Sequence, residues 1–473
     1  MEKIAAFLGS KRLYHALLAL TGVSLVLVQW FWWNAEGVDQ YSYVGLANGI
    51  LHHHFSQWWD MPVPIPDTFR TPGYPLYIAA ALALFGTWRA LALVQLVMYL
   101  VSLHLTFRTM ERYVAGYVPR NVLLLLLLPS VNVTTLAFVV SPEIPVMFCL
   151  SVLLWADPMR KRTHWFAAVG LGLIAGFIFQ CRPVFLLFPF VRLIMDLWFR
   201  RNDLVWRTHS LVIGTFILTL LPFGFWNKAH HGVFKVTPLE SGAGVFNLGY
   251  WAGRIPDYEE RRYFWNFTAD EMVRFVPKDS VPVEIAAYNM EWDRIDSEAA
   301  HALTKGDSLM IVIAKRSSDR TFTFNSQYVL AREKAVMRQT WRDIAQHPLY
   351  YLTFKAYSAV RLWVVGVDRT RFEEGGMIER SKLVMPFLFS LVTFLAMMIL
   401  VPLAHRVGGL ALKDTYPMVI LLVYWGLIHV PFTIQTRYTT SLRMVMYGLI
   451  GMAISVLLQR HRKPKAPSSW VAP

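Results

Sequence analysis

The sequence predicts an all-α polytopic membrane protein with about ten to twelve transmembrane or interfacial helices and one soluble insert. The 473 residues are 55% hydrophobic and only 16% charged, too few charges to cover a soluble protein of this size. Apolar runs of roughly 17–22 residues recur, and about 20 apolar residues cross the hydrocarbon core of a bilayer. A single long polar stretch, residues 230–350, interrupts this pattern.

The first apolar run is followed by no small-residue cleavage site, so we expect a retained helix and not a removed signal peptide. Residues 71–86 are short for a span and are expected to be re-entrant. Residues 351–367 contain Lys355 and Arg361 and are expected to form an interfacial helix. The predicted spans cover residues 13–33, 90–107, 120–139, 142–156, 163–180, 183–199, 209–228, 383–404, 415–434 and 438–458.

This pattern divides the chain into four parts. Residues 1–229 form an N-terminal membrane module, and residues 351–458 form the C-terminal membrane helices. The insert between them, residues 230–350, is predicted to be a soluble domain of mixed or helical structure, because stretches such as SDRTFTFNSQYVLAREK are polar and charged. Residues 459–473 form a basic tail.

The net charge of +15 is spread over short loops, which predicts contact with the lipid bilayer and argues against nucleic acid. Positive residues beside helix ends favour the cytoplasm. They cluster at the N-terminus, after residue 107, in DPMRKR, around Arg200 and in QRHRKPK. We therefore expect both termini in the cytoplasm, in a bacterial plasma (inner) membrane. The insert, Asp39, Ser141–Glu143, Arg182 and Gln435–Tyr438 then fall on the other face.

Asp39 follows the first span in GVDQYSY, at the expected boundary between membrane and water. Two interpretations remain open: a solvated acid that caps the helix starting near Gln40, or a general base. Glu36 competes for the second role but lies closer to the end of the span.

Three arginines lie on the same predicted face. Arg70 precedes TPGYPL, in which Thr71 and Pro72 are expected to start a helix. Arg182 stands between two apolar runs, and Arg437 lies in TIQTRY near the last span. Each can be a snorkelling side chain, or each can hold a phosphate in its planar fork. Glu143 in SPEIP is explained by the dipole of the helix it starts, and a functional role as a second carboxylate stays open.

The chain offers little for metal or nucleotide chemistry. His52, His53 and His54 are consecutive and point about 100° apart on a helix, a poor geometry for a metal. Cys149 and Cys181 lie in apolar runs and are expected to be buried thiols. No P-loop, GxSxG or zinc pattern appears. We expect no required cofactor, with a divalent cation left open.

The order of these elements resembles that of the GT-C membrane glycosyltransferases, the superfamily of protein O-mannosyltransferases and aminoarabinose transferases. The resemblance covers most of residues 1–230 and 345–458. It is carried, in order, by GVDQYSY, RTPGYPL, SPE, GLIAGFIFQCRP, HPLYYLTFKAYSAVRLW and QTRY. The chain departs from the family in having Asp39-Gln40 where many members carry two acids, and RTPG where many carry His-Pro-Pro.

The resemblance implies a transferase that moves a sugar from a polyprenyl-phosphate donor to a lipid, glycan or protein acceptor on the extracytoplasmic face. Asp39 would be the general base, and Arg70, Arg182 and Arg437 would hold the donor phosphate. Glu143 and Tyr41 would contact the acceptor or provide the second carboxylate. A transporter or flippase for a lipid-linked or anionic solute is the alternative, although no inverted repeat is visible. A structural membrane scaffold is a third.

Overall fold

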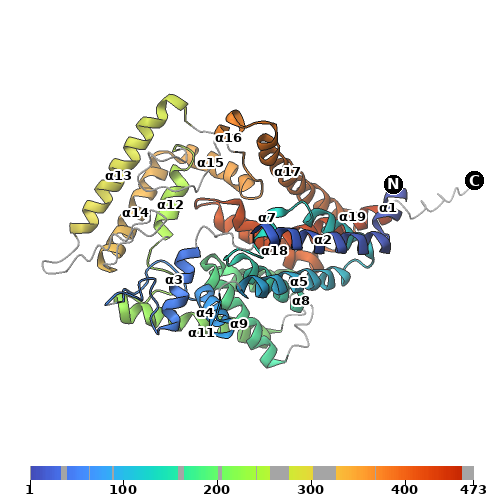
Figure 1. Ribbon diagram of the computed structural model, residues 1–473, viewed down its shortest axis with the longest axis horizontal. Coiled ribbons are helices and arrows are strands. Elements are labelled where there is room, and N and C mark those ends of the chain that lie inside the picture. Colours follow the sequence, from blue (N-terminus) through green and yellow to red (C-terminus); the bar gives the residue numbers. More distant parts are fainter. Residues whose placement is uncertain are drawn as a thin grey trace, which may run out of the picture.

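The computed structural model describes residues 2–32, 40–62, 64–87, 90–157, 164–200, 205–240, 242–255, 276–301, 326–367 and 369–460 (Figure 1). Within these ranges every regular element is a helix, as expected for an all-α membrane protein. The membrane module before the insert consists of α1 (Glu2–Leu8), α2 (Lys11–Trp32), α3 (Gln40–Leu51), α4 (Gly73–Phe85), α5 (Ala90–Glu111), α6 (Tyr117–Leu127), α7 (Val131–Thr135), α8 (Glu143–Ala156), α9 (Trp165–Cys181), η2 (Pro183–Leu187), α10 (Phe188–Phe199) and α11 (Trp206–His231).

The insert and the second half of the bundle follow. The insert contains α12 (Gly242–Trp251), η4 (Lys278–Ser280), α13 (Val281–His301) and α14 (Ser326–Gln346). The remaining helices are α15 (Pro348–Arg361), α16 (Arg369–Glu374), α17 (Met377–Arg406), α18 (Leu412–His429), η5 (Thr436–Leu442) and α19 (Arg443–Arg460).

Five described helical segments are long and apolar enough to cross a membrane: Lys11–Trp30, Ala90–Glu111, Trp206–His231, Met377–Arg406 and Arg437–Arg460. Four shorter apolar helices, α4, α6, α8 and α9, accompany them. The last of these segments, which includes α19, lies at the centre of the bundle, because 89% of its apolar 18-residue stretch is buried. Only 17% of the corresponding stretch of α17 is buried. The structure is therefore that of a membrane protein with a central α19 and a peripheral α17.

Two predicted spans are broken in the structure. Residues 120–139 form α6 and the short α7 and not one helix, because Pro129 follows the end of α6 and cannot donate a backbone hydrogen bond. Residues 183–199 form η2 and then α10, with prolines near the start of each. Residues 71–86 begin their helix at Gly73, one residue later than the predicted start at Pro72. Its 13 residues are too few for a simple crossing.

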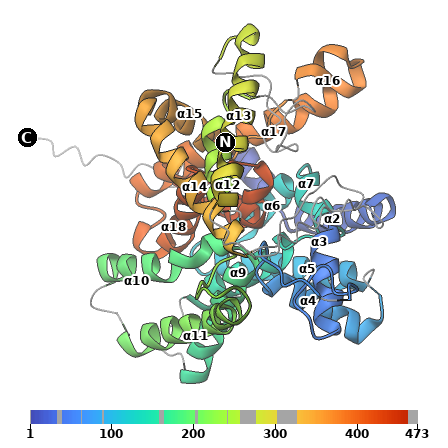
Figure 2. The same ribbon diagram turned by 90° about the vertical axis from the view of Figure 1, so that its left-hand side faces the viewer.

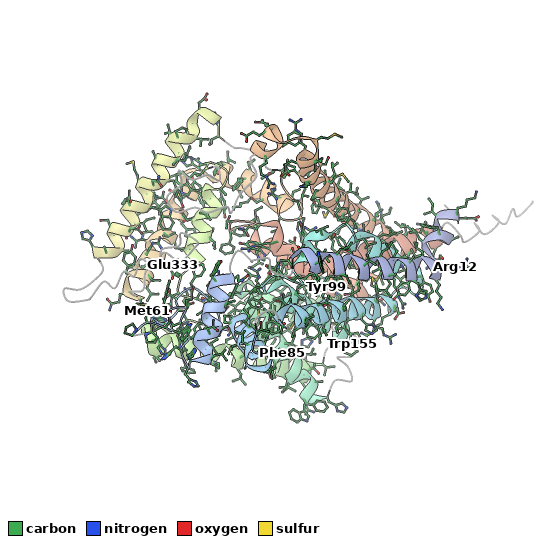
Figure 3. All side chains as sticks on the ribbon, in the orientation of Figure 1. Arg12, Met61, Phe85, Tyr99, Trp155 and Glu333 are labelled. Atoms are coloured by element: carbon green, nitrogen blue, oxygen red, sulfur yellow. The ribbon has the colours of Figure 1, made fainter. Side chains whose placement is uncertain are left out.

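The bundle has two distinct ends. Helices α2, α5, α8 and α19 run along the long axis of the molecule, with α1 at one end and α13 and α14 at the other (Figure 1). Viewed from the insert end, α12 to α15 lie in front of the bundle (Figure 2). Side chains follow the same division, because Arg12 lies at one end and Met61, from the segment after α3, lies with Glu333 of α14 at the other (Figure 3).

The insert has a hydrophobic core of its own. Tyr288, Trp292 and Ile295 of α13 are buried with Trp251 of α12 and Val336 of α14. The bundle forms a second, larger core around α19. Helix α9 packs closely on α11 through small residues. A Cβ added to Gly172 would lie 2.6 Å from the Cβ of Thr215.

Candidate functional site

Glu143 and Arg182 form an ion pair at the end of the bundle that faces the insert. Glu143 is the first residue of α8 and is only 2% exposed. Its carboxylate also accepts a hydrogen bond from the Ser141 hydroxyl, which in turn accepts one from the Glu143 N–H at 3.5 Å. The sequence predicted a helix start at SPEIP, and the structure adds that Ser141 supports the carboxylate itself.

Arg182 stands where α9 ends. Its backbone is extended, with φ −142° and ψ 92°, because the next residue is Pro183 and a residue before proline disfavours the helical conformation. The helix therefore terminates at the arginine. Arg182 has no acidic neighbour in sequence, but the structure supplies Glu143 from the preceding membrane helix, 39 residues away.

Tyr438 of η5 connects two of the predicted arginines. The Cζ of Arg182 lies 5.5 Å from the centre of the Tyr438 ring, and the Cζ of Arg437 lies 5.9 Å from it, both within cation–π range. The Tyr438 backbone is held by Trp425 of α18, whose Nε1 donates to the Tyr438 carbonyl at 2.8 Å. The Ser441 hydroxyl, also in η5, donates to the Glu143 carbonyl at 3.1 Å. Thus η5 covers the Glu143–Arg182 pair.

Arg70 lies on the first turns of α3. Its guanidinium is 3.4 Å from both the Ser42 and the Tyr43 hydroxyls, and its Cζ lies 4.7 Å from the centre of the Tyr43 ring. The loop that carries it is organised by buried Asp67, which accepts the Arg70 N–H at 2.7 Å and the Gln57 amide at 2.8 Å. Burial raises the pKa of Asp67, while these hydrogen bonds lower it.

Close contacts join the Arg70 loop to the Glu143–Arg182 pair. The Tyr43 and Tyr74 rings pack edge to face with centroids 4.9 Å apart, and the Tyr74 hydroxyl lies within hydrogen-bonding reach of the Ser141 backbone. A Cβ on Gly73 would lie 2.6 Å from Gln180, two residues before Arg182. The start of α4, the start of α8, the end of α9 and η5 therefore meet in one place.

Asp39 and Glu36 lie outside the described residues. Gln40 begins α3 directly after Asp39 and is buried, and Tyr41 is 45% exposed on the same first turn. The structure thus places the helix that follows Asp39 beside Arg70, and it leaves the prediction for Asp39 untested.

The site is attached to the insert through residues 431–435. The Thr433 N–H donates to the Val245 carbonyl of α12 at 2.9 Å. Lys355 of α15 donates its Nζ to the Phe432 carbonyl at 3.1 Å, and burial lowers the pKa of this lysine to about 7. Sequence reasoning identified Lys355 as a charge in an apolar run, but not this contact.

A second charged cluster lies at the other end of α8. Arg192 of α10 donates to Asp157 at 2.5 Å and to Asp196 at 2.9 Å, and Arg200 reaches Asp157 at 3.2 Å. Tyr416 of α18 and His209 of α11 contact Asp196. This cluster was not predicted from the sequence, although Arg192 and Asp196 have the i,i+4 spacing of a helical ion pair.

The histidines and cysteines considered for metal binding or disulfides pack against other side chains. His52 stacks on Trp59 with ring centroids 4.0 Å apart, at the end of α3. Cys149 and Cys181 are buried free thiols, as predicted. Over the described parts of the chain, no group of three or more His, Cys, Asp or Glu side chains is arranged to hold a metal ion.

Comparison with known proteins adds no relative: no family model matches the chain, and neither the curated proteins nor the solved structures contain a significant match.

Proposed function

We propose that the protein is a membrane glycosyltransferase that transfers a sugar from a polyprenyl-phosphate donor to an acceptor at the face of the bilayer covered by the insert. The observation that carries this proposal is the meeting of Arg182, Arg437 and Glu143 around Tyr438 at one end of the bundle. Arg70 is joined to this group indirectly, through the packed rings of Tyr43 and Tyr74. Before the structure, these residues were linked to one transfer reaction only by the order of their motifs along the chain.

In this reaction the acceptor hydroxyl loses its proton to Asp39 while its oxygen attacks the anomeric carbon of the sugar. The bond between that carbon and the phosphate oxygen breaks, and the electron pair leaves with the lipid phosphate. A positioned carboxylate that takes the proton is worth about 10²–10⁴-fold in rate. The leaving phosphate needs cations and no general acid, and guanidinium groups supply charge-assisted hydrogen bonds.

Glu143 acts as a positioning residue. Its carboxylate is buried, with Oε1 contacting Arg182 and Oε2 accepting from the Ser141 hydroxyl, so Ser141 fixes the carboxylate that in turn orients the arginine. A fixed guanidinium loses less freedom when it binds a phosphate, and this preorganisation favours the charged leaving group. Tyr41, exposed on the turn after Asp39, is available to an acceptor.

The location of the site suits a lipid-linked donor. Arg182 and η5 lie at the ends of apolar helices, where a polyprenyl chain can remain in hydrocarbon while its phosphate reaches the arginines. The insert covers this end of the bundle and is the natural place for the acceptor. We place this end outside a bacterial plasma membrane, with both termini in the cytoplasm.

Asp39→Asn tests the proposal. Purified protein in nanodiscs is incubated with radiolabelled polyprenyl-phosphate sugars and a membrane extract, and labelled acceptor is counted. Asn keeps the size of the side chain but takes no proton, so transfer should fall at least about a hundredfold. Asp60→Asn, an exposed acid in the segment after α3, is the matched control and should transfer normally.

Two outcomes contradict the proposal. If Asp39→Asn keeps more than about a tenth of the activity, Asp39 is not the base. If the wild-type protein labels no acceptor with any donor but moves labelled lipid between bilayer leaflets, the transporter alternative is correct.

A further inference from the structure

A cavity of about 290 Å³, lined by both apolar and polar side chains, lies against η5 beside the candidate site. Helix α7 and the residues before it, η5, α17 and the start of α19 form its walls. Two arginines line it, Arg437 and Arg443, together with Ser130, Asn132, Ser390 and Tyr447. Its volume suits a ligand head group better than a whole lipid or a large substrate.

Arg443 is the most informative residue of this cavity. It is only 6% exposed and is the first residue of α19, inside a segment apolar enough to cross the membrane. Its Nη2 donates to the Trp363 carbonyl at 2.8 Å and to the Thr439 hydroxyl at 3.1 Å, and Tyr447 lies within hydrogen-bonding reach. All these partners are neutral, and no carboxylate in the described parts of the chain contacts it.

Charged side chains at membrane depth face the bundle interior or a water-filled cavity, where they pair with one another or with backbone carbonyls, and they often mark ion or substrate sites. Here the charge borders a cavity that a second arginine also lines. The hydroxyls of Ser130 and Tyr447, 2.6 Å apart, add polar groups to the same wall. Two guanidinium groups with hydroxyl and amide neighbours are the chemistry that binds a phosphate.

The outer wall of the cavity is apolar and belongs to a lipid-facing helix. Pro386 and Phe389 of α17 line the cavity, while Met385, Leu388 and Val392 of the same helix are exposed by 66%, 46% and 63%. In a membrane these exposed side chains contact lipid tails. A ligand with a phosphate head can therefore place the head between the arginines and its tail along α17.

We propose that this cavity binds the head group of a lipid phosphomonoester, separately from the Glu143–Arg182 pair. Thr436–Leu442 lies between the two, with Tyr438 contacting Arg182 while Arg437 and Thr440 line the cavity. Arg437 is shared with the donor site of the proposed function, whereas Arg443 and Asn132 line only this cavity, so the test is made at these two residues.

Native mass spectrometry of the full-length protein counts bound lipids and tests this inference. The probes are decaprenyl phosphate, decaprenol without the phosphate, and inorganic phosphate. Arg443→Lys keeps the charge but loses the planar fork, and Asn132→Asp introduces a carboxylate at the exposed rim. Each change should weaken one decaprenyl phosphate binding event about tenfold and leave decaprenol binding unchanged.

Gln346→Glu, an exposed change of the same charge in α14, is the control and should bind as the wild type does. Equal binding of decaprenol and decaprenyl phosphate would overturn the inference, as would saturation by inorganic phosphate at the same concentration. So would unchanged lipid binding in Asn132→Asp, a variant at the rim that keeps the packing even if Arg443→Lys does not fold. The Asp39→Asn variant separates the two proposals. If it loses transfer but still binds this lipid, the result bears on the proposed function and not on the cavity.

Discussion

The two ends of α8 carry the same kinds of side chain under opposite electrostatic conditions. At its N-terminus Glu143 pairs with Arg182, whose Cζ lies 5.5 Å from the Tyr438 ring. Just after its C-terminus Asp157 pairs with Arg192, whose Cζ lies 4.7 Å from the Tyr416 ring. A helix dipole stabilises an anion at the N-terminus and destabilises one at the C-terminus.

This difference assigns the two arginines different tasks. Buried Asp157 faces the negative end of the dipole and needs both Arg192 and Arg200 to compensate its charge. Glu143 is already stabilised by the dipole and by Ser141, so Arg182 is not required to neutralise it. The Arg192 side chain is 6% exposed and that of Arg182 is 19% exposed. We call the more buried Asp157 end, which borders a cavity of about 50 Å³, the closed end, and the Glu143 end, with its more exposed arginine, the open end.

The largest expected effect concerns which end faces the cytoplasm. With Cys149 and Cys181 replaced by alanine, Ser280→Cys in the insert and Ser468→Cys in the tail are labelled separately with an impermeant maleimide on intact cells. We expect labelling at Ser280→Cys and protection at Ser468→Cys, since the basic loops favour a cytoplasmic tail. The reverse pattern would place the Asp157 end outside and remove the basis for an extracytoplasmic site.

The next largest effect is expected at the closed end. Arg192→Ala leaves Asp157 and Asp196 buried without their shared cation and should lower the free energy of unfolding by about 3–5 kcal/mol. Arg200→Ala, at the more exposed edge of the cluster, should cost about 1 kcal/mol or less. Denaturant titrations in detergent measure both. A cost for Arg192→Ala no greater than that for Arg200→Ala would show that the cluster is not a structural unit.

At the open end the conservative variant Arg182→Lys should reduce polyprenyl phosphate binding more than it reduces the stability of the fold. Arg182→Lys should weaken polyprenyl phosphate binding about tenfold, and Arg182→Ala about a hundredfold, because charged hydrogen bonds contribute about 1.5–3 kcal/mol. The same order should hold for Arg437→Lys and Arg437→Ala.

The melting temperature measured with and without polyprenyl phosphate distinguishes binding from folding. The lipid should stabilise the wild type through mass action, and the alanine variants should lose that shift. Glu143→Gln keeps the packing and should cost little stability in the absence of lipid. If both alanine variants retain the full shift, Arg182 and Arg437 are snorkelling structural residues, and Arg70 becomes the next candidate.

The smallest effect concerns a half-buried acid in the insert, Glu291 of α13. Burial, and then the charge of neighbouring Asp343, raise the pKa of Glu291 to about 7, although Asn247 donates to it at 3.1 Å. The folded state therefore holds a proton that the unfolded state releases near pH 4.5. Stability should be greatest below that value and fall by about 1–2 kcal/mol as the pH rises to 7.

Glu291→Gln should remove most of this slope, which thermal unfolding across the pH range measures. Glu284→Gln, at an acid paired with Arg254 on the same helix, is the control. A wild-type stability that rises between pH 4.5 and 7 would contradict the assignment, since it would mean that the carboxyl is held ionised.

Much of the fold follows from local patterns, and the pairing within the site does not. Apolar runs predicted the long helices, and the helix at residues 348–361 appears where the basic segment was expected. The break at Pro129 was missed because the surrounding run is apolar throughout. SPEIP and CRP each predicted a helix end correctly, but their contact depends on how α8 packs beside α9, which neither motif encodes.

Two further arginines, Arg443 and Arg192, were not predicted as functional or structural sites. Arg443 lies only six residues after Arg437, inside a predicted span, and an ionisable residue there should have been a candidate by default. Arg192 and Asp196 have helical spacing, yet Asp157, the acid that completes the cluster, is 35 residues away from Arg192. In both cases the sequence shows a charged residue inside an apolar run, but it does not show which residues contact that charge.

Residues 431–435 connect the insert to the segment that carries Arg437 and Tyr438. The Thr433 N–H is held by α12 and the Phe432 carbonyl by Lys355, while the next turn of the chain carries Arg437 and Tyr438. A displacement of α12 would therefore be transmitted through this linker to both side chains. If the proposed function is correct, an acceptor that docks on the insert would change how Arg437 is positioned toward the donor phosphate.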